Sequence, residues 1–283
     1  MEISVYSNAV YRKLRNHLLT ALGWVVVMLG AAAQAQSPDR VVVPLSDPTR
    51  PAMVRASVLN GGITVKTHAA SEVIVEARLR EREDRRQQGN MRRIPMTSTG
   101  LSVEEESNTV RVGVESLSRT VDLTITVPVN TSLKLNSTND GDIEVTGVNG
   151  EVDVNNTNGD VSLKNISGTV VAHALNGKIL VNFTSVSDKP MAFSSLNGDI
   201  DVTFPASIKA NIILTNNQGD VYSDFDLAMQ TTPPKQVVED GRSKGGKFKV
   251  KIDRSVVGTI NGGGPEIRFK NFNGDIFIRK GGM

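Results

Sequence analysis

The chain has 283 residues, with 32 Lys and Arg against 30 Asp and Glu, and it contains no cysteine. Without cysteine there are no disulfides and no thiolate ligands, so stability has to come from burial and backbone hydrogen bonds. The near balance of charges excludes a nucleic-acid binder that acts through a basic field over the whole chain. The length allows one large domain or two ordinary ones.

The first 35 residues have the three parts of a secretory signal peptide. Basic residues at positions 12, 13 and 15 precede an apolar run over residues 18–33, and Ala-Gln-Ala follows at 33–35. The run is short against the roughly 20 residues that span a bilayer. We therefore expect cleavage between Ala35 and Gln36, no membrane span in the mature chain, and a periplasmic, cell-surface or secreted location.

Cleavage would leave 29 basic and 29 acidic residues, and therefore a formal net charge of zero. It would also remove Trp24, so that eight Phe and Tyr222 are the aromatic residues of the mature chain. Sugar-binding surfaces usually stack sugars on exposed aromatic rings, and the mature chain has few aromatic residues for such a surface.

A glycine-punctuated repeat is most regular between Asp140 and Ser223. Glycine recurs at 141, 150, 159, 168 and 177 in steps of nine, and then at 198 and 219 in steps of twenty-one. Apolar residues two apart point to one face of a strand, and strands this short have to stack to bury that face. The second residue after each glycine is Ile143, Val152, Val161, Val170, Ile179, Ile200 and Val221, and the fourth is Val145, Val154, Leu163, Ala172, Val181, Val202 and Ser223. The seventh, a further mostly apolar position, is Val148, Thr157, Ile166 and Leu175.

Asn-Gly pairs dominate the turns of this repeat, because they accept positive φ at little cost. Such pairs also mark antiparallel hairpins, so a meander is the competing architecture. The copies resemble each other every eighteen residues, which favours a coil with two strands per turn. Stacked coils place like residues about 4.8 Å apart, and Asn158, Asn176 and Asn197 would then form a hydrogen-bonded ladder.

The flanks carry further copies and two interruptions. Residues 58–66 resemble one copy, and we expect the solenoid to begin there. The charged segment 78–93 mixes arginine with acidic residues and predicts a solvated loop or short helix. The segment 226–246 lacks the period and predicts a loop or an excursion from the solenoid. Residues 247–252 then alternate as a strand.

The chain closes with another copy over residues 264–280. We expect it to be a last coil, whose interior takes Ile267, Phe269, Ile276 and Ile278. In strand 247–252 the same alternation would point Phe248, Val250 and Ile252 inward and a row of lysines outward.

The repeated Asn-Gly-Asp-Ile-x-Val pattern and the closing Gly-Gly-Gly-Pro-Glu-Ile-Arg and Asn-Gly-Asp-Ile-Phe-Ile-Arg-Lys segments resemble the DUF4097 family. These are bacterial β-solenoid domains described as adhesin-like, without a demonstrated activity, and some occur in envelope-stress systems. The resemblance covers roughly residues 55–283 and implies an all-β, single-domain solenoid of 18- to 21-residue coils. We place the signal peptide at 1–35, a linker at 36–54 and the solenoid at 55–283.

Aspartate recurs directly after the turn glycine at Asp142, Asp160, Asp199, Asp220 and Asp275, with Lys178 in the middle of the run. A stacked carboxylate column repels itself, so calcium is a candidate ligand. Capping of local backbone groups is the simpler explanation. His68 and His173 lie far apart and suggest no zinc site, so we expect neither metal nor cofactor.

No nucleophile elbow, phosphate loop or dinucleotide fingerprint occurs in the sequence. We predict a non-enzymatic exported scaffold, adhesin-like, that contacts an envelope or surface protein or a glycan. The alternative is an extracytoplasmic sensor module of an envelope-stress system. A polysaccharide-degrading β-helix enzyme is a lesser alternative, because such enzymes use surface carboxylates of the kind present here.

Overall fold

The computed structural model describes residues 38–80, 98–115, 118–229, 236–240, 248–252 and 255–282. Within these residues every regular element is a β-strand, and residues 38–283 form one compact unit. The expected cleavage site at Ala35 and Gln36 lies outside the described residues, as does most of the charged segment 78–93. None of the described residues belongs to a helix long and apolar enough to span a bilayer.

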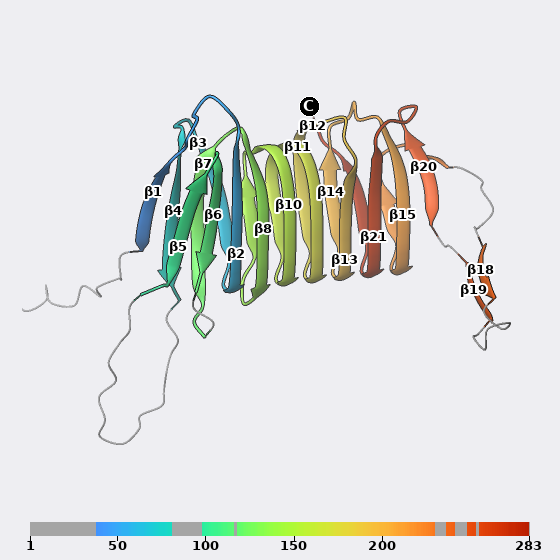
Figure 1. Ribbon diagram of the computed structural model, residues 1–283. Helices are drawn as coiled ribbons and strands as arrows, with labels where there is room; N and C mark the ends of the chain where they lie inside the picture. The colour runs from blue at the N-terminus through green and yellow to red at the C-terminus, as the bar shows by residue number, and fades with distance from the viewer. Residues whose placement is uncertain are drawn as a thin grey trace, which may run out of the picture. The chain divides into compact units, whose positions relative to one another are not determined.

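Parallel strands form two rows that together enclose one core, and part of the first row is visible in Figure 1 as a series of neighbouring arrows. In spatial order the first row is β6 (Thr109–Val114), β2 (Ala52–Asn60), β8 (Thr131–Asn139), β10 (Asn149–Asn158), the second half of β11 (Val161–Asn176), β13 (Met191–Asn197), β21 (Glu266–Asn273) and β15 (Ala210–Gln218). The second row is β7 (Val121–Pro128), β3 (Ile63–His68), β9 (Ile143–Thr146), the first half of β11, β12 (Ile179–Val186), β14 (Ile200–Phe204), β22 (Ile276–Lys280) and β16 (Val221–Ser223).

The pairing register confirms the predicted solenoid and excludes the meander for this region. Val161 pairs in parallel with Ile179, eighteen residues on, and Ile179 pairs in parallel with Ile200, twenty-one residues on. A hairpin would have paired consecutive strands antiparallel. One coil is therefore a strand of the first row, a glycine turn and a strand of the second row.

The core consists of the residues that alternate inward along both rows. The predicted second and fourth positions from Ile143 to Val202 are buried, and so are Ile267, Phe269, Ile276 and Ile278 of the closing segment. Four phenylalanines add an aromatic layer in the C-terminal coils, where Phe193 stacks on Phe269 and Phe183 on Phe204, each pair with ring centroids 5.2 Å apart. Such pairs stabilise beyond their buried area.

Three predicted interior residues lie outside the core. Leu175 is 43% exposed, because the second half of β11 continues in plain alternation and turns Ala172 and Ala174 inward instead. Val221 is 39% exposed and Ser223 is also exposed, because β16 pairs with β22 alone and lies at the end of its row.

The coils do not stack in the order of the sequence. The β2–β3 coil lies between the β6–β7 coil and the β8–β9 coil. The β21–β22 coil likewise lies between the β13–β14 coil and the β15–β16 coil. The closing segment, expected as the last coil, is therefore inserted one place before the end of the stack.

Antiparallel strands join the outermost coils of the two rows. β4 (Glu72–Leu79) pairs with β7, and β1 (Asp39–Pro44) pairs with β4, so part of the expected linker is a strand and ordered structure extends upstream of residue 55. In the first row β5 (Leu101–Glu106) pairs with β6, and β20 (Val256–Ile260) pairs with β15.

The segment 226–246, expected as a loop or an excursion from the solenoid, contains two strands. β17 (Ala228–Met229) pairs with β20, while β18 (Gln236–Asp240) forms a separate two-stranded sheet with β19 (Phe248–Ile252). The expected inward direction of Phe248, Val250 and Ile252 lies outside what the structure describes, since it describes no side chains there.

Candidate functional site

The glycine turns between the two rows form one edge of the solenoid, which we call the turn edge. At this edge the backbones of successive coils approach so closely that a side chain cannot fit. A Cβ placed on Gly177 would lie 2.0 Å from the carbonyl oxygen of Gly159, and one on Gly198 would lie 2.2 Å from that of Gly177. Gly159 and Gly198 also have positive φ. The repeat therefore requires glycine for two independent reasons.

An asparagine ladder runs along the first-row side of the turn edge, as the sequence predicted. The side-chain amide of Asn176 donates to the side-chain oxygen of Asn158, and that of Asn197 donates to Asn176, each at 2.9 Å. The ladder continues through Asn158 to Asn139 at 3.0 Å and from Asn139 to Asn60 at 3.3 Å.

The aspartate column on the other side of the turn edge caps backbone groups of the neighbouring coil. Oδ1 of Asp160 accepts from the backbone N–H of Lys178 at 2.7 Å, and Oδ1 of Asp199 accepts from that of Asp275 at 3.0 Å. Asp275 in turn caps Asp220 at 2.8 Å. The carboxylates therefore link successive coils, which gives the Asn-Gly-Asp signature a structural role.

Neither acidic nor histidine side chains assemble into a metal centre in the part of the chain that the structure describes. No group of three or more potential ligands lies close enough to share an ion. His68 Nε2 contacts the carbonyl oxygen of Glu72 at 2.8 Å, and His173 Nδ1 contacts the hydroxyl of Ser194 at 2.5 Å. His173 is on the outward side of β11, where the alternation predicted it.

A second polar column, inside the turn edge, was missed by the sequence analysis. Asn156 and Asn271 are buried and donate side-chain N–H groups to the turn carbonyls of Gly141 and Gly198, both at 3.1 Å. Ser195 bonds in the same way to Gly177. Most of these residues stand three positions before the turn glycine, so the spacing was available in the sequence, but their polarity suggested exposure.

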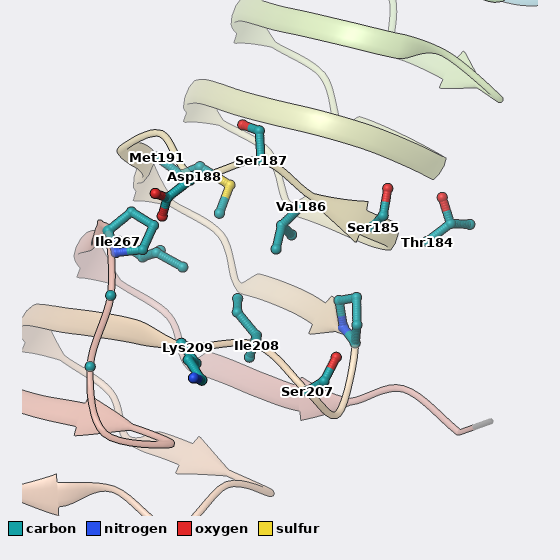
Figure 2. Close-up of a pocket in the computed structure, with 14 residues that line it drawn as sticks. Thr184, Ser185, Val186, Ser187, Asp188, Met191, Ser207, Ile208, Lys209 and Ile267 are labelled. Carbon is teal, nitrogen blue, oxygen red and sulfur yellow. The ribbon is translucent and has the colours of Figure 1, made fainter.

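A cleft of about 550 Å³ opens where the chain returns from the second row to the first (Figure 2). It is lined by the end of β12 and by the loops around Pro205 and Gly264. Val186, Ile208 and Met191 supply apolar lining, while hydroxyls of Ser185 and Ser207 are among the polar groups.

The described residues that line this cleft carry few ionisable groups. Among the residues that line it, Asp188 supplies the one carboxylate and Lys209 the one amine, and histidine is not among them. Glycoside hydrolysis usually needs two carboxylates across the bond that breaks. The arrangement suits hydrogen bonding over an apolar surface. No motif in the sequence marked this cleft.

An aromatic pair, an exposed tyrosine and a half-buried phenylalanine, lies beside the turn edge on the second row. The rings of Tyr222 and Phe277 stack with centroids 5.2 Å apart. The carboxylate of Asp220, helped by that of Asp275, raises the pKa of the Tyr222 hydroxyl above its ordinary value. Both rings stand three residues after a turn glycine, a signal that the sequence analysis did not use.

Arg279 anchors the Asp201 carboxylate on the same surface. Its Nε lies 2.7 Å from Asp201 Oδ1, and this hydrogen bond raises the pKa of the Arg279 guanidinium. The guanidinium carbon also lies 5.1 Å from the centre of the Phe277 ring, within the range of a cation–π contact.

The family comparison matches Toastrack DUF4097 over residues 54–261. The chain is therefore a member of the DUF4097 family of Toastrack domains. No curated protein matches it.

Two solved structures are similar to this chain over most of its length. One is a "putative cell adhesion protein" from Clostridium sporogenes, 12% identical, with a TM-score of 0.42, covering 86% of this chain and 100% of the other. The other is a "putative adhesin" from Bacteroides fragilis, 10% identical, with a TM-score of 0.38, covering 86% of this chain and 97% of the other.

Proposed function

We propose that this protein is an exported, non-enzymatic, adhesin-like scaffold that binds a glycan or protein of the cell envelope. The observation that carries the proposal is that different polar groups serve different roles, some in contacts between coils and others on surfaces open to a ligand. Asparagine and aspartate side chains at the turn edge hold successive coils together. The outward rows, the exposed side chains that flank the turn edge and the cleft of Figure 2 are then the surfaces for a ligand, and repetition at coil spacing suits shallow contacts spread over several coils.

Export is the first part of the proposal to test. Mass spectrometry of the protein recovered from its host should show a mature amino terminus at Gln36. Recovery of the uncleaved chain in the cytoplasm would contradict it.

Binding is the second part. The mature protein, labelled and applied to whole cells and to purified envelope glycans, should be retained by one of them. If an envelope extract instead yields one membrane signalling protein in stoichiometric amount, the sensor alternative is correct. Retention by neither cells, glycans nor envelope proteins would refute a binding function altogether.

Catalysis is the third part. No oligosaccharide should be released when the protein is incubated with a panel of polysaccharides. Release that disappears in Asp199→Asn or Asp220→Asn would show that the protein is an enzyme, because each change removes a carboxylate charge, and at Asp199 asparagine keeps the oxygen that caps the Asp275 N–H.

A further inference from the structure

Two positions of the repeat flank the turn edge: the second residue before the turn glycine and the third residue after it. In three neighbouring coils the first of these positions holds Leu175, Leu196 and Phe272, which are 43%, 41% and 45% exposed. They lie on β11, β13 and β21, which pair in parallel register. The three side chains therefore form a continuous apolar stripe along the first-row side of the edge.

The second-row side of the same coils is also apolar. Leu180 on β12 is 44% exposed and Tyr222 on β16 is 50% exposed, with the partly buried Phe277 stacked against Tyr222. Asp201 interrupts this row between Leu180 and Phe277. Large apolar side chains therefore stand on the first-row side in the β11–β12, β13–β14 and β21–β22 coils, and on the second-row side in the β11–β12, β21–β22 and β15–β16 coils, while Asn217 and Asp201 hold the remaining two positions.

The repeat itself shows that the fold does not require apolar residues at these positions. In the β10–β11 coil the same two positions hold Thr157 and Ser162. In the β8–β9 coil, whose turn is one residue longer, Thr138 lies in register with Thr157, and Glu144 holds the second position. A glycine turn and the asparagine ladder occur in both halves. A single exposed leucine is ordinary, but aligned ones that replace threonine in one half of a stack indicate an interaction surface.

The charge between the two apolar rows indicates the kind of partner. Asp199, Asp275 and Asp220 stand side by side at the edge. Asp199 and Asp275 each use Oδ1 for a backbone cap, and Oδ2 of Asp220 accepts from the Tyr222 hydroxyl at 3.4 Å. A groove of about 330 Å³ beside Asp199 has Leu180 and Phe277 in its lining, and its charged lining residues are Asp142, Glu144, Asp160, Asp199 and Asp201 with Lys178. Carboxylates therefore outnumber amines in this groove. An anionic membrane surface would be repelled, whereas Lys or Arg side chains would be attracted.

We propose that the turn edge of the last four coils docks a protein segment in which apolar side chains alternate with Lys or Arg. The apolar side chains would cover the stripe of Leu175, Leu196 and Phe272, and the basic ones would meet the aspartates. This inference rests on the proposed binding function and names the class of partner.

The test uses two labelled twelve-residue peptides, one of alternating Leu and Lys and one of alternating Leu and Glu. Fluorescence anisotropy with the mature full-length chain should show binding of the Leu-Lys peptide, weakened by added salt, and much weaker binding of the Leu-Glu peptide. In the triple variant Leu175→Thr, Leu196→Thr, Phe272→Thr, affinity should fall at least about tenfold, since truncated central apolar anchors carry most of such binding.

The repeat supplies the matched control. Thr157→Leu extends the stripe by one coil and should tighten binding of the Leu-Lys peptide, while Thr138→Ser should leave it unchanged. Circular dichroism of every variant establishes that the solenoid is folded. Threonine already occupies this repeat position in a neighbouring coil, so the triple variant should keep the wild-type spectrum and melting temperature.

Failure of the Leu-Lys peptide to bind, equal binding of both peptides, or full affinity in the triple variant would overturn the proposal. So would retention on anionic vesicles, or self-association in sedimentation, that is lost in the triple variant. If the triple variant still binds whole cells or glycans as the wild type does, this inference fails while the proposed function stands. If the wild-type chain binds nothing in either assay, both fail.

Discussion

Replacing Gly177 by alanine should strongly destabilise the solenoid, whereas the same change at Gly113 should not. The added Cβ at Gly177 would lie 2.0 Å from the carbonyl oxygen of Gly159 and 2.6 Å from its carbonyl carbon. Both atoms belong to the backbone of the neighbouring coil and cannot swing away. At Gly113, on β6, a Cβ would meet no atom within 4 Å.

The expected loss in the free energy of unfolding follows from how far the two coils have to move apart. To restore ordinary contact, the two coils must separate by roughly 1 Å at this point, which strains the bond from Gly159 N–H to the Asn176 carbonyl and the bond from Val161 N–H to the Lys178 carbonyl. Two lost hydrogen bonds cost about 1 kcal/mol each, and overpacking costs about 1–3 kcal/mol. The free energy of unfolding should therefore fall by about 3–5 kcal/mol in Gly177→Ala. Gly113→Ala should change the free energy of unfolding by less than about 1 kcal/mol.

Urea denaturation followed by circular dichroism measures both variants against the wild type, provided that the slopes of the transitions agree. A Gly177→Ala variant as stable as Gly113→Ala would refute the conclusion that backbone contact at the turn edge selects glycine. A loss at Gly113 as large as at Gly177 would show instead that any alanine in this fold is harmful.

Three further predictions concern single side chains. Phe193→Ala should lower the free energy of unfolding by about 3–5 kcal/mol because it empties the aromatic layer, and Phe193→Leu should lower it by less; equal losses in urea denaturation would contradict this. Asp199→Ala should lower the melting temperature more than Asp199→Asn, because only asparagine keeps an acceptor for the Asp275 N–H; identical melts would show that the cap is unimportant. The hydrogen bond from the Ser46 hydroxyl lowers the pKa of Glu105, so its contribution is present at neutral pH and is lost as the pH falls through that lowered pKa. The difference in melting temperature between wild type and Glu105→Gln should accordingly shrink on acidification, and a difference that does not change with pH would argue against a charge effect.

The repeat was readable from the sequence because its causes are local. Alternation two residues apart and a glycine at each turn determine which side chains point inward, as Ile143, Val161 and Ile200 show. The asparagine ladder followed from the same spacing, since parallel stacking places equal repeat positions next to each other. These features need no knowledge of which coil lies next to which.

The order of the coils depended on the tertiary structure. β3 pairs in the same parallel register with β7 on one side and with β9 on the other, so similar repeats offer several nearly equivalent neighbours. The antiparallel strands β4 and β20 pair with the outermost coils, β4 with β7 and β20 with β15, and these long-range pairings are visible only in the tertiary structure.

The surfaces proposed for binding also depended on the tertiary structure. Periodicity placed Leu175 in the interior, but the unbroken alternation of β11 exposes it beside Leu196. The inserted β21 places Phe272 on the other side of Leu196, seventy-six residues after Leu196 in the chain. Local sequence determined the turn edge and its inward residues. Only the stacking of distant segments assembled the apolar stripe and the cleft, because a surface shared by several coils exists only once their neighbours are chosen.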